Sequence, residues 1–127
     1  MKANELMIGD WVLVHKLTCK GHRVDYINEM EEEIGADGEI YDVCDIKQIP
    51  LTPEILEKNG FESDTNMFGL CDYELSESYI LENRGDRFCF VKRIPSYSST
   101  FHMFDVKYAH QLQHALRLCQ IEKEIEL

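Results

Sequence analysis

Apolar and polar residues alternate over short stretches in the first third of the chain, and this pattern predicts strands. Residues 8–16 are typical of a turn that leads into a strand, because their β-branched and aromatic side chains suit a pleated surface. Residues 21–27 and 39–43 predict two further strands, and the Gly and Asp residues at 35–38 predict a turn. Short strands bounded by glycine predict a small, strongly bent sheet or partial barrel.

The clearest local signal lies at residues 52–60 and predicts a helix of fewer than two turns. The Thr52 hydroxyl can cap this helix, and Pro53 suits the first helical position, where a missing N–H has no cost. Asn59 and Gly60 can end it in the left-handed region. Because so short a helix is not stable alone, we expect it to link two halves of the chain.

The second half begins irregularly at residues 62–66 and then predicts a hairpin. Its strands are expected at 79–82 and 87–92, joined across residues 83–86. After a polar loop at residues 95–100, another short strand is expected at residues 101–104.

A C-terminal helix is predicted from Val106 to about Cys119, with Asp105 as its N-cap. Apolar residues at helical spacing form one stripe on it: Val106, Ala109, Leu112, Leu116 and Cys119. Residues 122–127 alternate charged and apolar side chains and predict a last edge strand.

Together these elements predict an α+β fold. An N-terminal bent sheet or SH3-like small barrel is expected over residues 1–50, and a linking helix over residues 51–61. Residues 62–127 are expected to form an α+β subdomain in which an antiparallel sheet is covered by one C-terminal helix. A chain of 127 residues allows one compact domain or two very small ones.

Charge is unevenly distributed: 24 Asp plus Glu face 13 Lys plus Arg, a formal net charge of −11. One acidic stretch contains no Lys or Arg, and its acids are Asp25, Glu29, Glu31, Glu32, Glu33, Asp37, Glu39, Asp42 and Asp45. Such a field repels phosphate backbones, so direct nucleic-acid binding is not expected. It suits a basic protein partner, with Glu31, Glu32 and Glu33 as candidate partner-binding residues. The alternative is a solvated surface that only keeps the protein soluble.

The five cysteines are widely spaced and form no C-x-x-C pair, and the first residues show no secretion signal. We therefore expect reduced thiols in a cytoplasmic protein. No stretch approaches the ~18 apolar residues of a membrane span, so no membrane association is expected.

His110 and His114 are four residues apart, a spacing with which one helix can offer two ligands to a metal ion. However, Gln111 stands where the metalloprotease motif has its catalytic Glu, and both imidazoles are expected on the solvent side of the helix. Residues 64–72 match a calcium loop only in part, since apolar residues occupy two of its ligand positions. We therefore expect no metal ligand, no cofactor and no catalytic residue.

Three separated segments resemble one family. Residues 1–12 (MKANELMIGDWV), 49–61 and 110–116 (HQLQHAL) resemble, in this order, small uncharacterised proteins from Bacteroidota and their phages. The resemblance implies no activity and no functional residue. The Gly9-Asp10 pair before a strand is also similar to SH3-like small barrels.

The leading hypothesis is a non-enzymatic protein–protein interaction module, encoded by a phage or mobile element, that binds a basic partner through its acidic surface. Two alternatives stay open. One is a small metal-dependent enzyme using His110 and His114. The other is a nucleic-acid mimic that occupies the basic groove of a DNA-binding protein, which requires carboxylates along one face at phosphate-like intervals.

Overall fold

The computed structural model describes residues 2–14, 21–67, 69–94 and 99–127. Over these residues the chain is an α+β protein, mostly β, with two antiparallel five-stranded sheets and two short α-helices. It divides into two compact units, Met1–Pro50 with Tyr108–Gln113 and Leu127, and Leu51–Lys107 with His114–Glu126. The three-part division at residues 50 and 61 stays a prediction.

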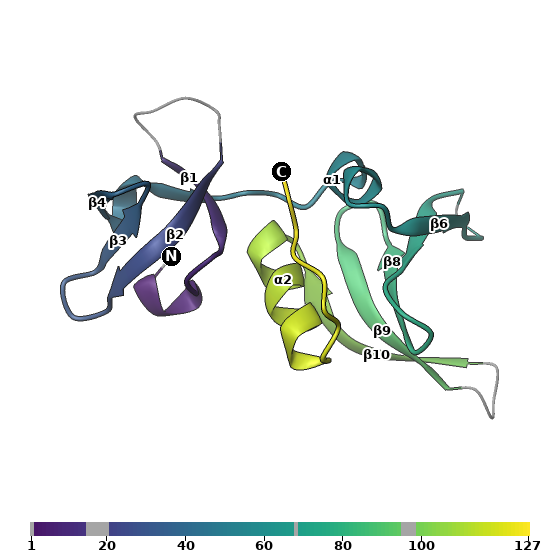
Figure 1. The fold of residues 1–127 in the computed structure, drawn as a ribbon. Helices are drawn as coiled ribbons and strands as arrows, with labels where there is room; N and C mark the ends of the chain where they lie inside the picture. Colours follow the sequence, from purple (N-terminus) through teal and green to yellow (C-terminus); the bar gives the residue numbers. More distant parts are fainter. Residues whose placement is uncertain (1, 15–20, 68, 95–98) are drawn as a thin grey trace. The chain divides into compact units, whose positions relative to one another are not determined.

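The first sheet has the strand order β4-β3-β2-β1-β5 (Figure 1). Its strands are β1 (Trp11–Val14), β2 (His22–Asn28), β3 (Glu33–Ala36), β4 (Glu39–Asp42) and β5 (Ile46–Gln48). One 3₁₀ turn, η1 (Ala3–Glu5), precedes β1, and another, η2 (Val43–Asp45), leads from β4 into β5. The three strands predicted from alternation are confirmed as β1, β2 and β4.

One face of the first sheet is apolar. Burial alternates along β1, where Val12 and Val14 are buried, because successive side chains of a strand point to opposite faces. The buried cluster consists of Ala3, Leu6, Val12, Val14, Val24, Ile34 and Ile46. Ala3 belongs to η1 and Leu6 follows it directly, so this turn covers part of the core.

Two strands of this sheet, β3 and β5, were not predicted. The turn expected at residues 35–38 is wrong in its first half, because Gly35 lies in β3 and pairs with both β2 and β4. The turn falls on Asp37 and Gly38, whose φ angles are 53° and 83°. A side chain at Gly35 would place its Cβ only 2.6 Å from that of Tyr26, so glycine permits the close approach of β2.

The predicted short helix is confirmed as α1 (Pro53–Lys58). The Ile55 N–H donates to the Thr52 hydroxyl at 3.4 Å, and Pro53 occupies the first turn, as the capping pattern predicted. Gly60 follows with a φ of 78°. Leu56 is fully buried and anchors the helix in the second unit.

The second sheet has the order β10-β9-β8-β7-β6. Its strands are β6 (Glu62–Thr65), β7 (Cys71–Glu74), β8 (Tyr79–Asn83), β9 (Phe88–Ile94) and β10 (Ser99–Val106). The predicted hairpin is confirmed as β8 and β9. The irregular start expected at residues 62–66 is wrong, because residues 62–65 pair with β7. Most of the polar loop predicted at 95–100 lies outside the described residues.

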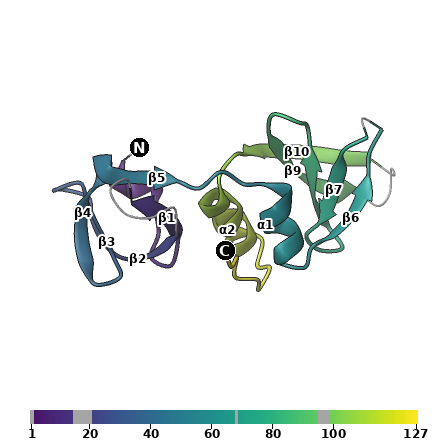
Figure 2. The same ribbon diagram turned by 90° about the horizontal axis from the view of Figure 1, so that it is seen from above.

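One face of the second sheet carries the core of its unit. Tyr73, Leu81 and Phe90 come from three neighbouring strands and are fully buried, and Phe90 stacks on Phe104 at 4.9 Å between ring centroids. Helix α1 and the C-terminal half of α2 (Ala109–Leu118) lie along this face in both views (Figures 1 and 2). The predicted antiparallel sheet is therefore present, but α1 and part of α2 lie along it rather than the one C-terminal helix expected.

The start of the C-terminal helix was predicted too early. Asp105 and Val106 belong to β10, where Val106 pairs with Phe88, and the helix begins only at Ala109. The apolar stripe is otherwise real, because Ala109, Leu112 and Leu116 are all buried. Val106 matches the helical spacing by coincidence: it is buried as a strand residue.

The predicted edge strand at residues 122–127 is wrong, because this segment forms no strand. It is held by side-chain hydrogen bonds instead. Asn59 donates from Nδ2 to the Glu126 carbonyl and accepts from the Glu126 N–H, both at 2.7 Å. Ile125 is buried beside this connection.

Candidate functional site

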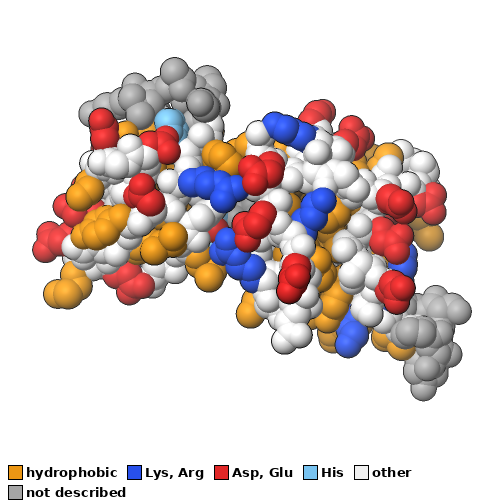
Figure 3. Space-filling model, viewed as in Figure 1, with side chains coloured by type: hydrophobic (Ala, Val, Ile, Leu, Met, Phe, Trp, Pro, Cys, Tyr) orange, Lys and Arg blue, Asp and Glu red, His pale blue; other side chains and the backbone are white. Residues whose placement is uncertain are grey.

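The acidic stretch at residues 25–45 lies at the surface of the first unit. None of its nine carboxylates belongs to a buried residue, as predicted for a solvated surface. On the face shown in Figure 3, acidic side chains are visible over both units. The candidate partner-binding residues differ among themselves: Glu31 is exposed, whereas Glu32 and Glu33 are half-buried.

Glu32 contributes to the local fold. Its carboxylate accepts a hydrogen bond from the Ala3 N–H at 2.8 Å, and its carbonyl accepts one from the Val43 N–H at 2.8 Å. Its φ is 51°, which places it in the tight connection between β2 and β3. Glu33, the next residue, pairs with Asp42 in the ladder of β3 and β4. Binding of a partner by Glu31, Glu32 and Glu33 stays a prediction.

Other acids of this stretch also hold turns. Asp25 accepts from the Gly38 N–H at 3.3 Å, and Asp37 contacts Nδ1 of His22. Asp42 caps η2 by accepting from the Cys44 N–H at 3.0 Å, and this hydrogen bond lowers the pKa of the Asp42 carboxyl. The acids that are densest along the chain are thus largely engaged in local structure.

A second acidic surface lies on the second sheet, on the face opposite its core. Glu62 pairs with Glu74, and Asp64 with Asp72, so these four carboxylates stand on one side of β6 and β7. Glu74 in turn pairs with Ile80 of β8. We call this side the open face, because the buried residues Tyr73 and Leu81 point the other way.

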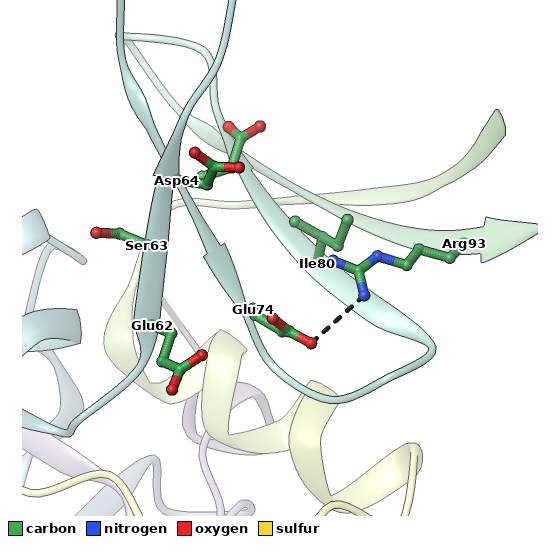
Figure 4. A pocket seen from close by; sticks show the side chains of 7 residues that line it. Glu62, Ser63, Asp64, Glu74, Ile80 and Arg93 are labelled. Carbon is green, nitrogen blue, oxygen red and sulfur yellow. Dashed lines mark hydrogen bonds and ion pairs between the residues drawn. The ribbon is translucent and has the colours of Figure 1, made fainter. Parts of the chain in front are cut away.

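The open face contains a shallow hollow of about 340 Å³, lined by Glu62, Ser63, Asp64, Asp72, Glu74, Ile80 and Arg93 (Figure 4). Ser63 points to the other side of β6, as strand alternation requires. Arg93 pairs with Glu74 at 3.4 Å, so the four carboxylates of the hollow face one guanidinium. The half-buried Ile80 supplies an apolar patch among them.

Asp72 is the fixed member of this set. Its Oδ1 accepts from Asn66 Nδ2 at 2.8 Å and from the Asn83 N–H at 3.0 Å. Because Asn66 directs its amide nitrogen at Asp72, its oxygen accepts elsewhere, from the Leu70 N–H at 3.2 Å. The partial calcium loop is therefore a hydrogen-bonded hairpin connection between β6 and β7, with Phe68 outside the described residues.

A second group of reactive side chains lies on the same face, on β9 and β10. Cys89 pairs with Asp105, and Val91 pairs with His102. A β-bulge between His102 and Phe104 inserts an extra residue, and this brings His102 and Asp105 to the same side although they are three residues apart. Ligand atoms of Cys89, His102 and Asp105 all lie within 4.8 Å of one another.

Hydrogen bonds connect this cluster. The Cys89 thiol donates to Asp105 Oδ1 at 3.3 Å, and His102 Nε2 lies 3.0 Å from the same oxygen. The other oxygen, Oδ2, is 3.5 Å from Nε of Arg87. Burial raises the pKa of the Cys89 thiol, while the hydrogen bonds from Cys89 and His102 lower the pKa of Asp105.

The histidines singled out by the sequence do not join such a group. His110 is buried, which contradicts its expected place on the solvent side of the helix, and His114 is half-buried. Among the residues that the structure describes, the only group of three or more metal-ligating side chains is Cys89, His102 and Asp105.

Sequence reasoning missed both groups on the open face. The carboxylates at 62 and 64 and at 72 and 74 alternate with other residues at the spacing of a strand, a signal visible in the sequence. No comparable signal marks the Cys89 cluster, because the bulge that assembles it has no sequence signature. The four described cysteines, Cys44, Cys71, Cys89 and Cys119, are free thiols, and Cys19 lies outside the described residues.

No family model, curated protein or solved structure matches this chain. None of the described helices is both long and apolar enough to cross a membrane.

Proposed function

We propose that this chain is a non-enzymatic interaction module that binds a basic segment of another protein on the open face of its second sheet. One observation carries the proposal: four carboxylates and one apolar side chain, Ile80, line the same hollow. A lysine or arginine side chain has the matching chemistry, since its aliphatic stem packs on apolar surface while its charged end stays among polar groups. The free thiols fit the cytoplasmic location expected from the sequence.

The hollow is better suited to this role than the Glu31–Glu33 segment predicted from the sequence. Glu32 already accepts a hydrogen bond within its own unit. By contrast, the Glu62 carboxylate forms no hydrogen bond or ion pair with any described residue, so it is available to a partner. Nearby, Asp72 is held in place and needs no reordering on binding.

We also propose that the first sheet forms an SH3-like small barrel. Two features support it: β1 pairs with both β2 and β5, and a 3₁₀ turn joins β4 to β5. Small barrels of this kind host many unrelated functions, so the proposed role depends on the hollow of the second sheet and not on this fold.

The test is a titration of the ¹⁵N-labelled protein with a synthetic lysine-rich peptide, followed by amide chemical shifts. We expect the largest shifts in β6, β7 and β8, and weaker binding as salt increases from low to moderate concentration. Shifts centred on residues 25–45 would place binding on the first unit, as the sequence predicted. Binding that ignores salt would contradict an electrostatic interface.

Two matched double variants sharpen the test. The first double variant, Glu62→Gln with Glu74→Gln, removes two negative charges from the second unit. The second, Glu29→Gln with Glu31→Gln, removes two negative charges from the first unit. Because each exposed charge pair contributes roughly 0.2–1 kcal/mol, the first double variant should weaken binding about 2- to 30-fold. The second should leave affinity nearly unchanged, and equal losses would point to non-specific attraction by net charge.

The nucleic-acid mimic stays a second candidate, because carboxylates two residues apart on one strand stand about 6.6–6.8 Å apart in regular rows. If this protein is a nucleic-acid mimic, DNA should compete with it for the partner. A partner that binds the open face and DNA simultaneously would exclude the mimic and leave the interaction module standing.

A further inference from the structure

We propose that Cys89, His102 and Asp105 form a binding site for a divalent metal ion of the zinc class. The three side chains offer one sulfur, one nitrogen and one oxygen atom, a donor set that zinc accepts in proteins. This inference is independent of the proposed peptide binding, since it concerns strands β9 and β10 rather than the acidic hollow.

The distances suit a tetrahedral ion. With the usual zinc–ligand bond lengths, ligand atoms of a tetrahedral site stand about 3.4–3.6 Å apart. In the structure, Asp105 Oδ1 is 3.3 Å from Cys89 Sγ and 3.0 Å from His102 Nε2. The cluster as a whole spans no more than 4.8 Å, so small side-chain rotations bring all three atoms onto one ion.

The backbone already holds the ligands on one side of the sheet. Cys89 and Asp105 are direct partners in the ladder of β9 and β10, and the bulge after His102 turns this imidazole to the same side. Cys89 is buried, whereas the side chains of His102 and Asp105 are 53% and 44% exposed. An ion can therefore enter from solvent and meet a thiol at the base of the site.

Arg87 orients the carboxylate. It holds Oδ2 of Asp105, which leaves Oδ1 directed at Cys89 and His102, as an outer partner of a metal ligand does. On binding, the Cys89 thiol loses its proton to solvent and the sulfur bonds to the metal ion as thiolate. The two positive charges of the ion are then balanced by one thiolate and one carboxylate, so the three ligands and the ion form a neutral unit. Because only one proton leaves, binding raises the local charge beside Arg87 by one unit.

Cobalt(II) is the probe, because a cobalt–thiolate bond gives a near-ultraviolet absorption band. Under a reductant that does not bind metals, we expect the full chain to bind one equivalent of Co²⁺ with this band, and Zn²⁺ to displace it. Cys89→Ser should abolish the band. Cys44→Ser is the matched control, since Cys44 is the exposed thiol and lies between Asp42 and Asp45; this variant should bind as the wild type does.

His102→Gln tests the site without altering a buried residue, and should weaken Co²⁺ binding at least about 10-fold with the fold intact by circular dichroism. His114→Gln should leave it unchanged. The proposal is overturned if the wild-type chain shows no band at stoichiometric Co²⁺, if the band survives Cys89→Ser, or if His102→Gln binds Co²⁺ as tightly as the wild type. It is equally overturned if the band disappears in Cys44→Ser, which would assign the thiolate to the other unit.

Discussion

The two sheets carry their carboxylates in different ways. In the first, Glu32 lies in a connection and Asp25 and Asp42 lie in strands, and all three accept hydrogen bonds from backbone N–H groups. In the second, Glu62 and Glu74 are paired strand residues that project onto one face. Acids of the first sheet therefore stabilise its backbone by hydrogen bonds, whereas acids of the second sheet project from one face.

Acids that are close together in the sequence are therefore not always the acids that are close together in the structure. The stretch at residues 25–45 is the more acidic sequence, yet its side chains are distributed over several turns. Strand pairing brings positions 62, 64, 72 and 74, up to twelve residues apart, into one hollow. Sheet register, which a single sequence specifies only weakly, decides which acids act together.

The largest expected effect comes from the covered side of the second sheet. Phe90→Ala removes a fully buried ring stacked on Phe104 and should lower the free energy of unfolding by about 3–5 kcal/mol. Urea denaturation measures this change. The control is Phe101→Ala on β10, where the side chain is exposed and the expected change is within about 0.5 kcal/mol. Phe101 lies on the same side of the sheet by register but beyond the covered area, so equal losses would contradict the difference in burial between the two rings.

Asp72→Ala separates the one structural acid of the open face from its neighbours. It leaves Asn66 Nδ2 and the Asn83 N–H without their shared acceptor, and we expect a loss of about 2–3 kcal/mol in unfolding free energy. Glu62→Ala, the control on the same hollow, should change stability by less than about 0.5 kcal/mol. If Glu62→Ala lowers the unfolding free energy as much as Asp72→Ala does, the exposed acids of the hollow also stabilise the fold.

Glu32→Ala tests the structural use of acids in the first sheet. It removes the acceptor of the Ala3 N–H, and we expect a loss of about 1.5 kcal/mol, measured by urea denaturation. Its neighbour Glu31 is exposed, so Glu31→Ala should be nearly neutral. If both substitutions are neutral but weaken peptide binding, the Glu31–Glu33 segment is a partner site after all.

The smallest effect concerns acid. The Cys44 N–H holds the pKa of Asp42 below its usual range, so Asp42 stabilises the fold above its unfolded pKa of about 3.9. This contribution is lost as pH falls through the lower folded-state value. The stability difference between wild type and Asp42→Asn should therefore shrink below about pH 4, measured by urea denaturation at several pH values. A difference that stays constant would contradict the capping role.

Local signals predicted the elements that depend on few residues. The Thr52-Pro53 cap defined α1, and the turn at residues 83–86 defined the hairpin of β8 and β9. Strands β3, β5, β6 and β7 were missed. Strand β6 is exposed at every position, so no apolar run marks it, and Gly35 of β3 was assigned to a turn. Their existence depends on pairing with distant segments, which propensity does not encode.

The candidate site was predictable only in part. The acidic character of the surface followed from composition, whereas the paired rows on β6 and β7 were not singled out. Partner binding by Glu31, Glu32 and Glu33, the densest run, stays a prediction. His102 and Asp105 would face opposite sides of a regular strand, so the bulge that unites them with Cys89 could not be foreseen. His110 was placed on the solvent side from helical geometry alone, whereas it is buried.

Strand β6 stands at the border of its sheet, and both of its outward rows are polar. A border strand can template the addition of a strand from another molecule, and negative side chains such as Glu62 and Asp64 discourage this by mutual repulsion. A bound cationic peptide would cancel that repulsion. We therefore expect turbidity, as a measure of association through β6, to rise first at peptide concentrations that saturate the hollow.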